Sequence, residues 1–197
     1  MIAMIFQLTK NIPNILSSIR IIITIPFIFS LYDLILGTGS IISLLLFSII
    51  IISDILDGYL ARKLNFVSAF GANLDIFADI FYSFLSTTIL CYLNVVPIWF
   101  LFIVIFKFLE FVITSKFLKN YKKINSTIHS ETKKDNFLYF DWLGRSFGIL
   151  TMLLPGLVCI IYLFSYQLIG IISYTILILT IIAISSTILR LIKIKIA

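Results

Sequence analysis

Charged residues are scarce in this sequence. Only 12% of its 197 residues are Asp, Glu, Lys or Arg, whereas 61% are hydrophobic and the mean hydropathy is +1.16. A soluble domain has about a quarter charged residues, and one core of this length could not bury so many Ile, Leu and Phe side chains. The surplus is expected to face lipid, which excludes an ordinary soluble domain. The net charge of +6 is therefore interpreted as a sign of membrane topology and not of nucleic-acid binding.

Cysteine and histidine are also rare. Cys91 and Cys159 lie in apolar runs without metal-site spacing, so they predict no disulfide framework and are interpreted as small buried hydrophobic residues. The single histidine, His129, lies in a polar segment, where a solvated side chain is favoured over a catalytic one. No small-residue cleavage site follows the first apolar stretch, so we expect a retained helix there and no removable signal peptide.

The hydrophobic residues form six segments near the length of roughly 20 residues that a helix needs to cross a bilayer. We place them at about residues 15–36, 41–60, 69–93, 97–117, 140–164 and 169–192. The sequence therefore predicts an all-α integral membrane protein with six transmembrane helices in a single domain, residues 1–197. Gly144 and Gly148, at the start of the fifth segment, have the spacing of a helix-packing pair, and chance spacing is the alternative.

Two polar stretches are expected to interrupt the helices. Residues 118–137 are interpreted as a solvated cytoplasmic loop. Residues 11–14 (Asn-Ile-Pro-Asn) are expected to break the chain before the first span. Residues 1–10 then form either an amphipathic helix in the membrane interface or a frayed end.

The positions of Lys and Arg predict the orientation. The loops around residues 37–40, 94–97 and 165–167 contain neither residue, whereas basic residues gather at the opposite ends of the segments. By the positive-inside rule, both termini of this multi-pass protein are expected on the cytoplasmic side of the cell membrane. Lys107 is the basic residue that falls deep inside a span.

Four acidic residues crowd one end of the second and third spans: Asp54, Asp57, Asp75 and Asp79. Spacings of three and four residues place each pair on one helix face. A charge at the centre of a membrane helix costs about 2.5–3.5 kcal/mol on insertion scales, and like charges at close range repel. Mg²⁺ or Mn²⁺ relieves this conflict because both prefer oxygen ligands. The acids therefore predict a site for two metal ions, a type that serves phosphoryl displacement.

Small residues and a cation accompany these acids. Gly58, Ala61 and Gly71 leave room for a ligand near the backbone, and Arg62 offers a fork for phosphate oxygens. Two other interpretations stay open on residue chemistry alone. The acids are ordinary interface anchors paired with nearby Arg or Lys, or they belong to an ion or proton pathway.

The run Asp54-x2-Asp57-Gly58-x2-Ala61-Arg62-x8-Gly71-x3-Asp75-x3-Asp79 resembles, at every fixed position, the signature of the CDP-alcohol phosphatidyltransferases. Residues 11–20 are similar to the opening of that family. The stretch Trp142-Leu143-Gly144-Arg145 is more weakly similar to the Trp-Ile-Gly-Lys segment of phosphatidylglycerophosphate synthases.

This resemblance implies a homodimer whose cavity faces the cytoplasm and which transfers a phosphatidyl-type group from a CDP-linked lipid to an alcohol, releasing CMP. It implies the following roles. Asp54, Asp57 and Asp75 bind Mg²⁺ or Mn²⁺, and Asp79 is the general base and a further metal ligand. Asp57, Gly58, Ala61, Arg62 and Gly71 bind the nucleotide.

The acceptor alcohol is less well defined by the resemblance. Relatives that use glycerol phosphate usually have Lys where this chain has Ile80, and they tend to have Arg where it has Leu109. Lys107 shares a helix face with Glu110, so it either supplies the missing cation or only neutralises the glutamate. Arg145 either binds an acceptor phosphate or anchors the helix at the interface.

Lys63 is a further candidate for the acceptor phosphate. Glycerol 3-phosphate is the favoured acceptor, and inositol phosphate, serine or a second phospholipid are alternatives. An ion or solute transporter is the alternative from a different class, and the nearly uncharged outer halves of the spans argue against it.

Overall fold

The chain folds into long helices because backbone groups inside a bilayer must find their hydrogen bonds within the chain. The computed structural model describes the backbone of residues 2–63, 69–125, 138–164 and 166–196; within these ranges the side chains of residues 2–14, 57, 60–63, 69–70, 72, 114–125, 138–141, 166 and 191–196 are not described. The elements are α1 (Ile2–Ile35), α2 (Ile42–Lys63), α3 (Ala69–Tyr92), α4 (Ile98–Asn125), α5 (Leu138–Phe164), the 3-10 turn η1 (Tyr166–Leu168) and α6 (Gly170–Ile196). The described part of the chain contains helices and no strand, which confirms the all-α prediction.

Four stretches of these helices are long and apolar enough to cross a membrane: Ile15–Ile35, Asn73–Tyr92, Trp142–Phe164 and Gly170–Arg190. The apolar part of α2 is shorter, Ile42–Leu56, and it contains Asp54 near its C-terminal end. Hydroxyl side chains inside the helices donate to carbonyl oxygens of the preceding turn, as Thr24 does to Arg20 and Ser86 to Tyr82. The chain is therefore a multi-pass membrane protein.

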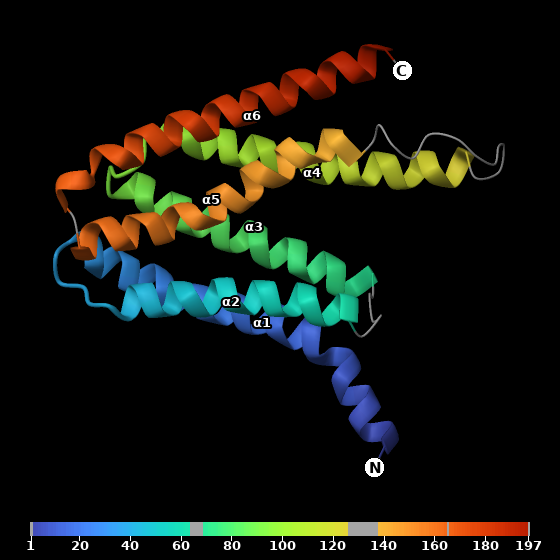
Figure 1. The fold of residues 1–197 in the computed structure, drawn as a ribbon, viewed down its shortest axis with the longest axis horizontal. Helices are drawn as coiled ribbons and strands as arrows, with labels where there is room; N and C mark the ends of the chain where they lie inside the picture. Colours follow the sequence, from blue (N-terminus) through green and yellow to red (C-terminus); the bar gives the residue numbers. More distant parts are fainter. Residues whose placement is uncertain (1, 64–68, 126–137, 165, 197) are drawn as a thin grey trace.

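Two expected interruptions are helical in the structure. The predicted break at residues 11–14 is wrong, because α1 continues through Pro13 and only changes direction in its N-terminal part (Figure 1). A proline inside a helix removes one hydrogen bond and bends the helix without necessarily ending it. The predicted loop also begins too early, since α4 extends to Asn125. Polarity marks the end of the apolar span there, whereas Lys and Leu still favour helix. Residues 126–137 and the side chains of residues 1–10 lie outside the described part.

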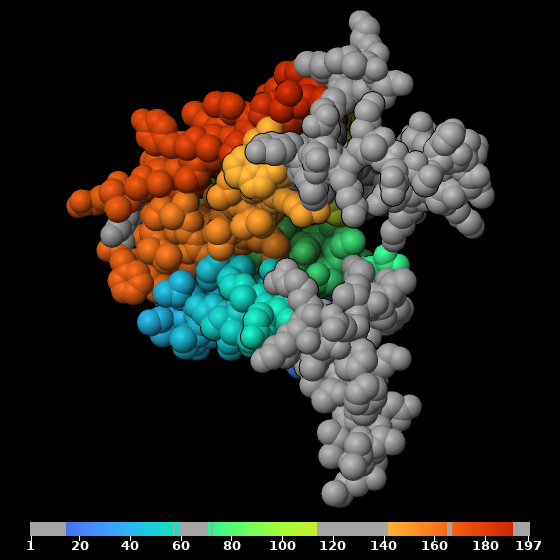
Figure 2. Space-filling model, turned by 45° about the vertical axis from the view of Figure 1, so that its right-hand side comes forward, coloured from blue at the N-terminus to red at the C-terminus, as the bar shows by residue number. Residues whose placement is uncertain are grey.

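The helices are arranged so that α1 and α2 lie along one side, α6 lies along the other, and α3, α4 and α5 lie between them (Figure 1). A second view shows α2 and α5 on the same face, with α3 visible between them (Figure 2). Phe27 of α1 is fully buried, with its ring 5.7 Å from that of Tyr82 and 6.4 Å from that of Phe47. Tyr82 donates a hydrogen bond to the Met152 carbonyl at 3.3 Å. This cluster joins α1, α2, α3 and α5.

The turn after α1 sets the antiparallel pairing of α1 and α2. Gly37 has a φ of 83°, a left-handed conformation that glycine adopts without strain. The Gly37 amide donates to the Leu34 carbonyl at 3.1 Å, and the Thr38 amide donates to the Asp33 carbonyl at 3.0 Å. The chain therefore reverses directly into α2, whose far end carries the acidic residues. Both chain termini lie toward that same end of the bundle (Figure 1).

Candidate metal and substrate site

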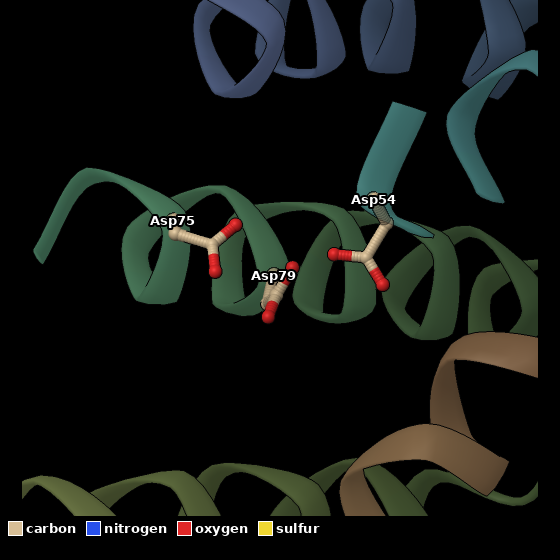
Figure 3. A group of neighbouring side chains, drawn as sticks. All are labelled: Asp54, Asp75 and Asp79. Atoms are coloured by element: carbon tan, nitrogen blue, oxygen red, sulfur yellow. The ribbon is translucent and has the colours of Figure 1, made fainter. Parts of the chain in front are cut away.

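Three carboxylates from two helices converge at this end. Asp54 of α2 and Asp75 and Asp79 of α3 each offer an oxygen within 4.8 Å of the others. Figure 3 shows the three side chains beside one another, with Asp75 and Asp79 on one face of α3. Their side chains are 34%, 40% and 32% exposed, respectively, so they are not closed off by the rest of the protein. The structure thus brings together three of the four acids that the sequence singled out.

Arg20 of α1 is fully buried and ties these carboxylates together. Its Nη2 lies 2.8 Å from Asp54 Oδ1, its Nη1 lies 3.2 Å from Asp75 Oδ1, and it also pairs with Asp79. The interpretation of the acids as partners of a nearby arginine is therefore correct in part. Three carboxylates that meet at one guanidinium place several negative charges close together, an arrangement that a bound cation would stabilise.

The donor set fits a hard divalent cation. Mg²⁺ binds oxygen at about 2.1 Å, so two ligands on opposite sides of the ion lie about 4.2 Å apart. The separation of up to 4.8 Å within the triad is close to this span, and small side-chain rotations bring the oxygens into range. The residues present are therefore compatible with Mg²⁺ or Mn²⁺.

The other residues of the signature flank the triad along α2 and α3. Gly58 follows Asp54 by one turn, and Gly71 precedes Asp75 by one turn; both glycines are partly exposed. The side chains of Asp57, Ala61, Arg62 and Lys63 lie outside the described part, so their predicted roles stay predictions.

A cavity of about 260 Å³ adjoins the triad. Asp54 and Asp79 lie on its wall, and Ile76, Phe108 and Phe147 supply apolar surface. Three cations also line this cavity: Lys107 of α4, Arg145 of α5 and Arg190 of α6. The arrangement places acidic oxygens and basic groups around a single space, which suits a substrate that carries both a metal-bound and a free phosphate.

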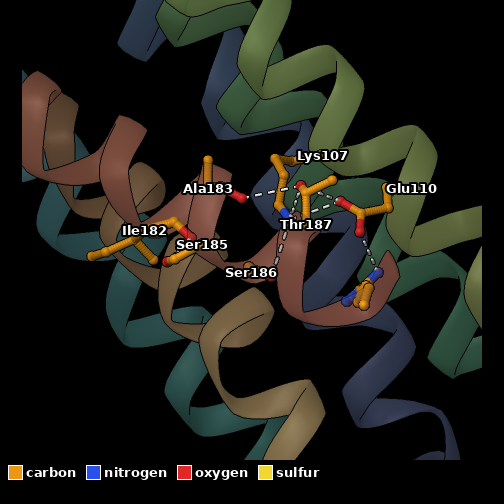
Figure 4. Close-up of polar contacts among 8 residues, drawn as sticks. Lys107, Glu110, Ile182, Ala183, Ser185, Ser186 and Thr187 are labelled. Atoms are coloured by element: carbon orange, nitrogen blue, oxygen red, sulfur yellow. Dashed lines mark hydrogen bonds and ion pairs between the residues drawn. The ribbon is translucent and has the colours of Figure 1, made fainter. Parts of the chain in front are cut away.

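A second polar cluster lies behind the cationic wall, between α4 and α6 (Figure 4). Lys107 Nζ lies 2.7 Å from Glu110 Oε2 and also donates to the Ser186 hydroxyl at 3.1 Å. Arg190 Nη1 lies 3.3 Å from Glu110 Oε1. The predicted pairing of Lys107 with Glu110 is confirmed. Lys107 lines the cavity at the same time, so the pairing does not exclude contact with substrate.

Sequence reasoning missed Arg190 as a site residue, because its position near the C-terminus looked like a topology signal. Ser186 and Arg190 are four residues apart, so they share one face of α6. A charge on the same face of a mostly apolar helix as a hydroxyl group is a signal for an inward-facing polar site, and it could have been found from sequence. Sequence reasoning also missed the central position of Arg20, which was counted among the basic residues at the ends of the segments.

The fold and the site together define a helical, multi-pass membrane protein with an acidic triad, two of whose carboxylates line a cavity that also has cations on its wall. Residues 10–192 match the sequence model of a family described as CDP-alcohol phosphatidyltransferase, and the chain belongs to this family. This match confirms the resemblance seen in the signature.

Curated relatives share the same printed name, CDP-diacylglycerol–glycerol-3-phosphate 3-phosphatidyltransferase. The protein of Rickettsia prowazekii (strain Madrid E) is 40% identical over 73 residues, which is 37% of this chain and 40% of the relative. The protein of Wigglesworthia glossinidia brevipalpis is 42% identical over 69 residues, or 35% of this chain and 37% of the relative. A protein of Salmonella choleraesuis (strain SC-B67) gives the same identity and coverage. The matched stretches thus span about two fifths of the relatives.

Proposed function

We propose that this protein is a divalent-metal-dependent phosphatidyltransferase of phospholipid biosynthesis. It transfers the phosphatidyl group of CDP-diacylglycerol to glycerol 3-phosphate and releases CMP. The observation that carries the proposal is the cavity in which Asp54 and Asp79 share one space with Lys107, Arg145 and Arg190. Family membership and the printed names of the relatives support the same reaction.

The acidic residues bind the metal ions and carry out the chemical step in this proposal. Asp54, Asp57, Asp75 and Asp79 would hold two ions of Mg²⁺ or Mn²⁺, and the bound cations would neutralise the pyrophosphate of the donor. Asp79 lines the cavity and acts as general base. It takes the proton of the acceptor hydroxyl as that oxygen attacks the phosphorus that carries the lipid. The bond from this phosphorus to the bridging oxygen of CMP breaks, and CMP leaves with the electron pair.

The remaining signature residues hold the nucleotide in this proposal. Gly58 and Gly71 lie one turn from Asp54 and Asp75 and have no side chain to fill the space beside them. Asp57, Ala61 and Arg62 are assigned by the motif match alone.

The cationic wall supplies the acceptor subsite. Lys107, Arg145 and Arg190 project from three helices toward the cavity, and charge-assisted bonds to a phosphate are stronger than neutral ones. A phosphorylated acceptor is therefore favoured over serine. Lys63 is retained as a prediction on the sequence alone.

The proposal includes six transmembrane spans in one domain, residues 1–197. Both termini and the site lie on the cytoplasmic side of the cell membrane in this proposal. The common location of the chain ends and the uncharged loops at the opposite end support this orientation (Figure 1). The homodimer rests on the resemblance to the family. A transporter receives less support, because the outer halves of the spans are nearly uncharged.

One assay tests the proposed function. Purified protein in lipid nanodiscs is incubated with CDP-diacylglycerol, Mg²⁺ or Mn²⁺, and either glycerol 3-phosphate, inositol phosphate, serine or phosphatidylglycerol, and CMP release is measured. Release that requires glycerol 3-phosphate is expected. Release with another acceptor only would change the assigned alcohol, and no CMP with any acceptor, using ester or ether lipid donors, would contradict the transferase assignment.

A further inference from the structure

Glu110 of α4 lies between the two cations that α4 and α6 contribute to the cavity wall. Its Oε2 is 2.7 Å from Lys107 Nζ, and its Oε1 is 3.3 Å from Arg190 Nη1. One carboxylate therefore contacts both cations through different oxygens. All three side chains are largely buried, with 5% exposure for Lys107, 14% for Glu110 and 7% for Arg190.

The hydroxyl groups of α6 complete this cluster. Thr187 Oγ1 lies 3.3 Å from Lys107 Nζ and 3.3 Å from Glu110 Oε2, and Ser186 Oγ accepts from Lys107 at 3.1 Å. These bonds join α4 to α6 inside an apolar environment, where a charge without a partner is costly. The position of the Lys107 ammonium group is thus set by Glu110 and by α6 together.

Among the described residues, Lys107 and Arg190 line the cavity and Glu110 does not. The carboxylate thus contacts both cations without itself lining the space where substrate would bind. Each of the two cations therefore contacts the carboxylate and also reaches the cavity wall. Glu110 is therefore placed to act on Lys107 and Arg190 and not on the substrate directly.

We propose that Glu110 is a positioning residue for the acceptor phosphate: it holds Lys107 and Arg190 close together against their mutual repulsion, so that both reach one phosphate group. This inference rests on the proposed transfer to glycerol 3-phosphate.

Glu110→Gln tests the proposal, because it removes the charge and keeps the shape. The KM for glycerol 3-phosphate is expected to rise by about tenfold, the size of one lost charge-assisted contact. The KM for CDP-diacylglycerol is expected to change by less than about twofold, since the donor binds at the acidic wall. A merely structural role predicts instead a lower melting temperature with equal effects on both substrates.

Thr187→Val keeps the proposal testable if the first variant does not fold. It deletes one hydroxyl of the cluster at constant shape and is expected to raise only the KM for glycerol 3-phosphate, by about threefold. Ser185→Ala is the matched control on the same helix, because the Ser185 hydroxyl donates to the Ile182 carbonyl at 3.0 Å and does not contact Lys107 or Glu110 in the described structure. The control is expected to match the unaltered protein.

The outcomes separate the two proposals. If the unaltered protein releases no CMP, the proposed function fails. If it is active, and Glu110→Gln or Thr187→Val changes the two KM values equally or not at all, the positioning role is overturned and the transferase assignment stands.

Discussion

The guanidinium group of Arg20 on α1 lies 2.8 Å from the Asp54 carboxylate on α2, inside the protein and without exposure to solvent. The same side chain pairs with Asp75 and Asp79 of α3. One buried cation therefore joins three helices at the point where a metal ion is proposed to bind. Arg20 and the metal would neutralise the same carboxylates, so the effect of one should depend on the other.

Arg20→Gln is expected to destabilise the metal-free protein by about 3 kcal/mol, the lower end of the cost of removing one partner from a buried ion pair, because the carboxylates are partly exposed. Mg²⁺ should stabilise this variant more than the unaltered protein, since it replaces the lost positive charge. Melting temperatures in EDTA and in Mg²⁺ measure both effects. Arg145→Gln removes the same charge at an exposed position and should change stability by less than about 0.5 kcal/mol. Equal stability of Arg20→Gln in EDTA would refute the role of Arg20.

Asp79→Asn should abolish turnover while the protein stays folded. A positioned general base contributes roughly 10²- to 10⁴-fold to rate, and the amide cannot accept the hydroxyl proton. Single-turnover CMP release at saturating substrates measures the chemical step. Asp33→Asn, an exposed acid at the opposite end of α1, is the control and should keep full activity. Retained turnover in Asp79→Asn would remove Asp79 as the base.

Chelation of divalent cations should stop CMP release, and added Mg²⁺ or Mn²⁺ should restore it. Binding to the folded state alone also raises the melting temperature as the cation concentration rises. Asp54→Asn is expected to increase the metal concentration for half-maximal activity by at least about tenfold, because one charged ligand is lost. Activity that survives exhaustive chelation would argue against metal dependence.

Arg145→Ala should weaken only acceptors that carry a phosphate. Arg145 is exposed and lines the cavity on α5, so its removal leaves the buried pair of Lys107 and Arg190 in place. A rise of about tenfold in the KM for glycerol 3-phosphate is expected, with little change for the lipid donor. CMP release measured with glycerol and with glycerol 3-phosphate as acceptors distinguishes phosphate binding by Arg145 from anchoring of the helix. Equal losses with phosphorylated and unphosphorylated acceptors would show that Arg145 only anchors the helix.

Much of the fold could be predicted from sequence because bilayer helices are specified by long apolar runs. The expected segments coincide with α2, α3, α5 and α6 to within a few residues at the apolar ends. The errors occur where a helix continues beyond its apolar segment, because hydrophobicity there no longer predicts whether the chain is helical. The α4 helix continues past its apolar part to Asn125, and α1 continues through Pro13.

The acidic side of the site could also be predicted, because Asp75 and Asp79 share a helix face at fixed spacing and Asp54 belongs to the same signature. The cationic side could be predicted only in part. The pairing of Lys107 with Glu110 follows from their spacing on α4, whereas the contact of Glu110 with Arg190 depends on the packing of α4 against α6, which their separation in sequence does not indicate. Arg20 illustrates the same limit, since its pairing with three acids depends on how α1 packs against α2 and α3.

Gly144→Ala offers a way to disturb Arg190 without removing any charge. A Cβ at Gly144 would lie 2.8 Å from Arg190 Nη2, so the guanidinium must move aside. Alanine favours helix over glycine by up to about 1 kcal/mol, so α5 should be no less stable, while the KM for glycerol 3-phosphate should rise by about threefold as the flexible arginine shifts. Gly170→Ala is the control, because a Cβ there meets nothing within 4 Å. Melting temperature and both KM values are measured for each variant. An unchanged KM for glycerol 3-phosphate in Gly144→Ala would show that the position of Arg190 does not limit acceptor binding.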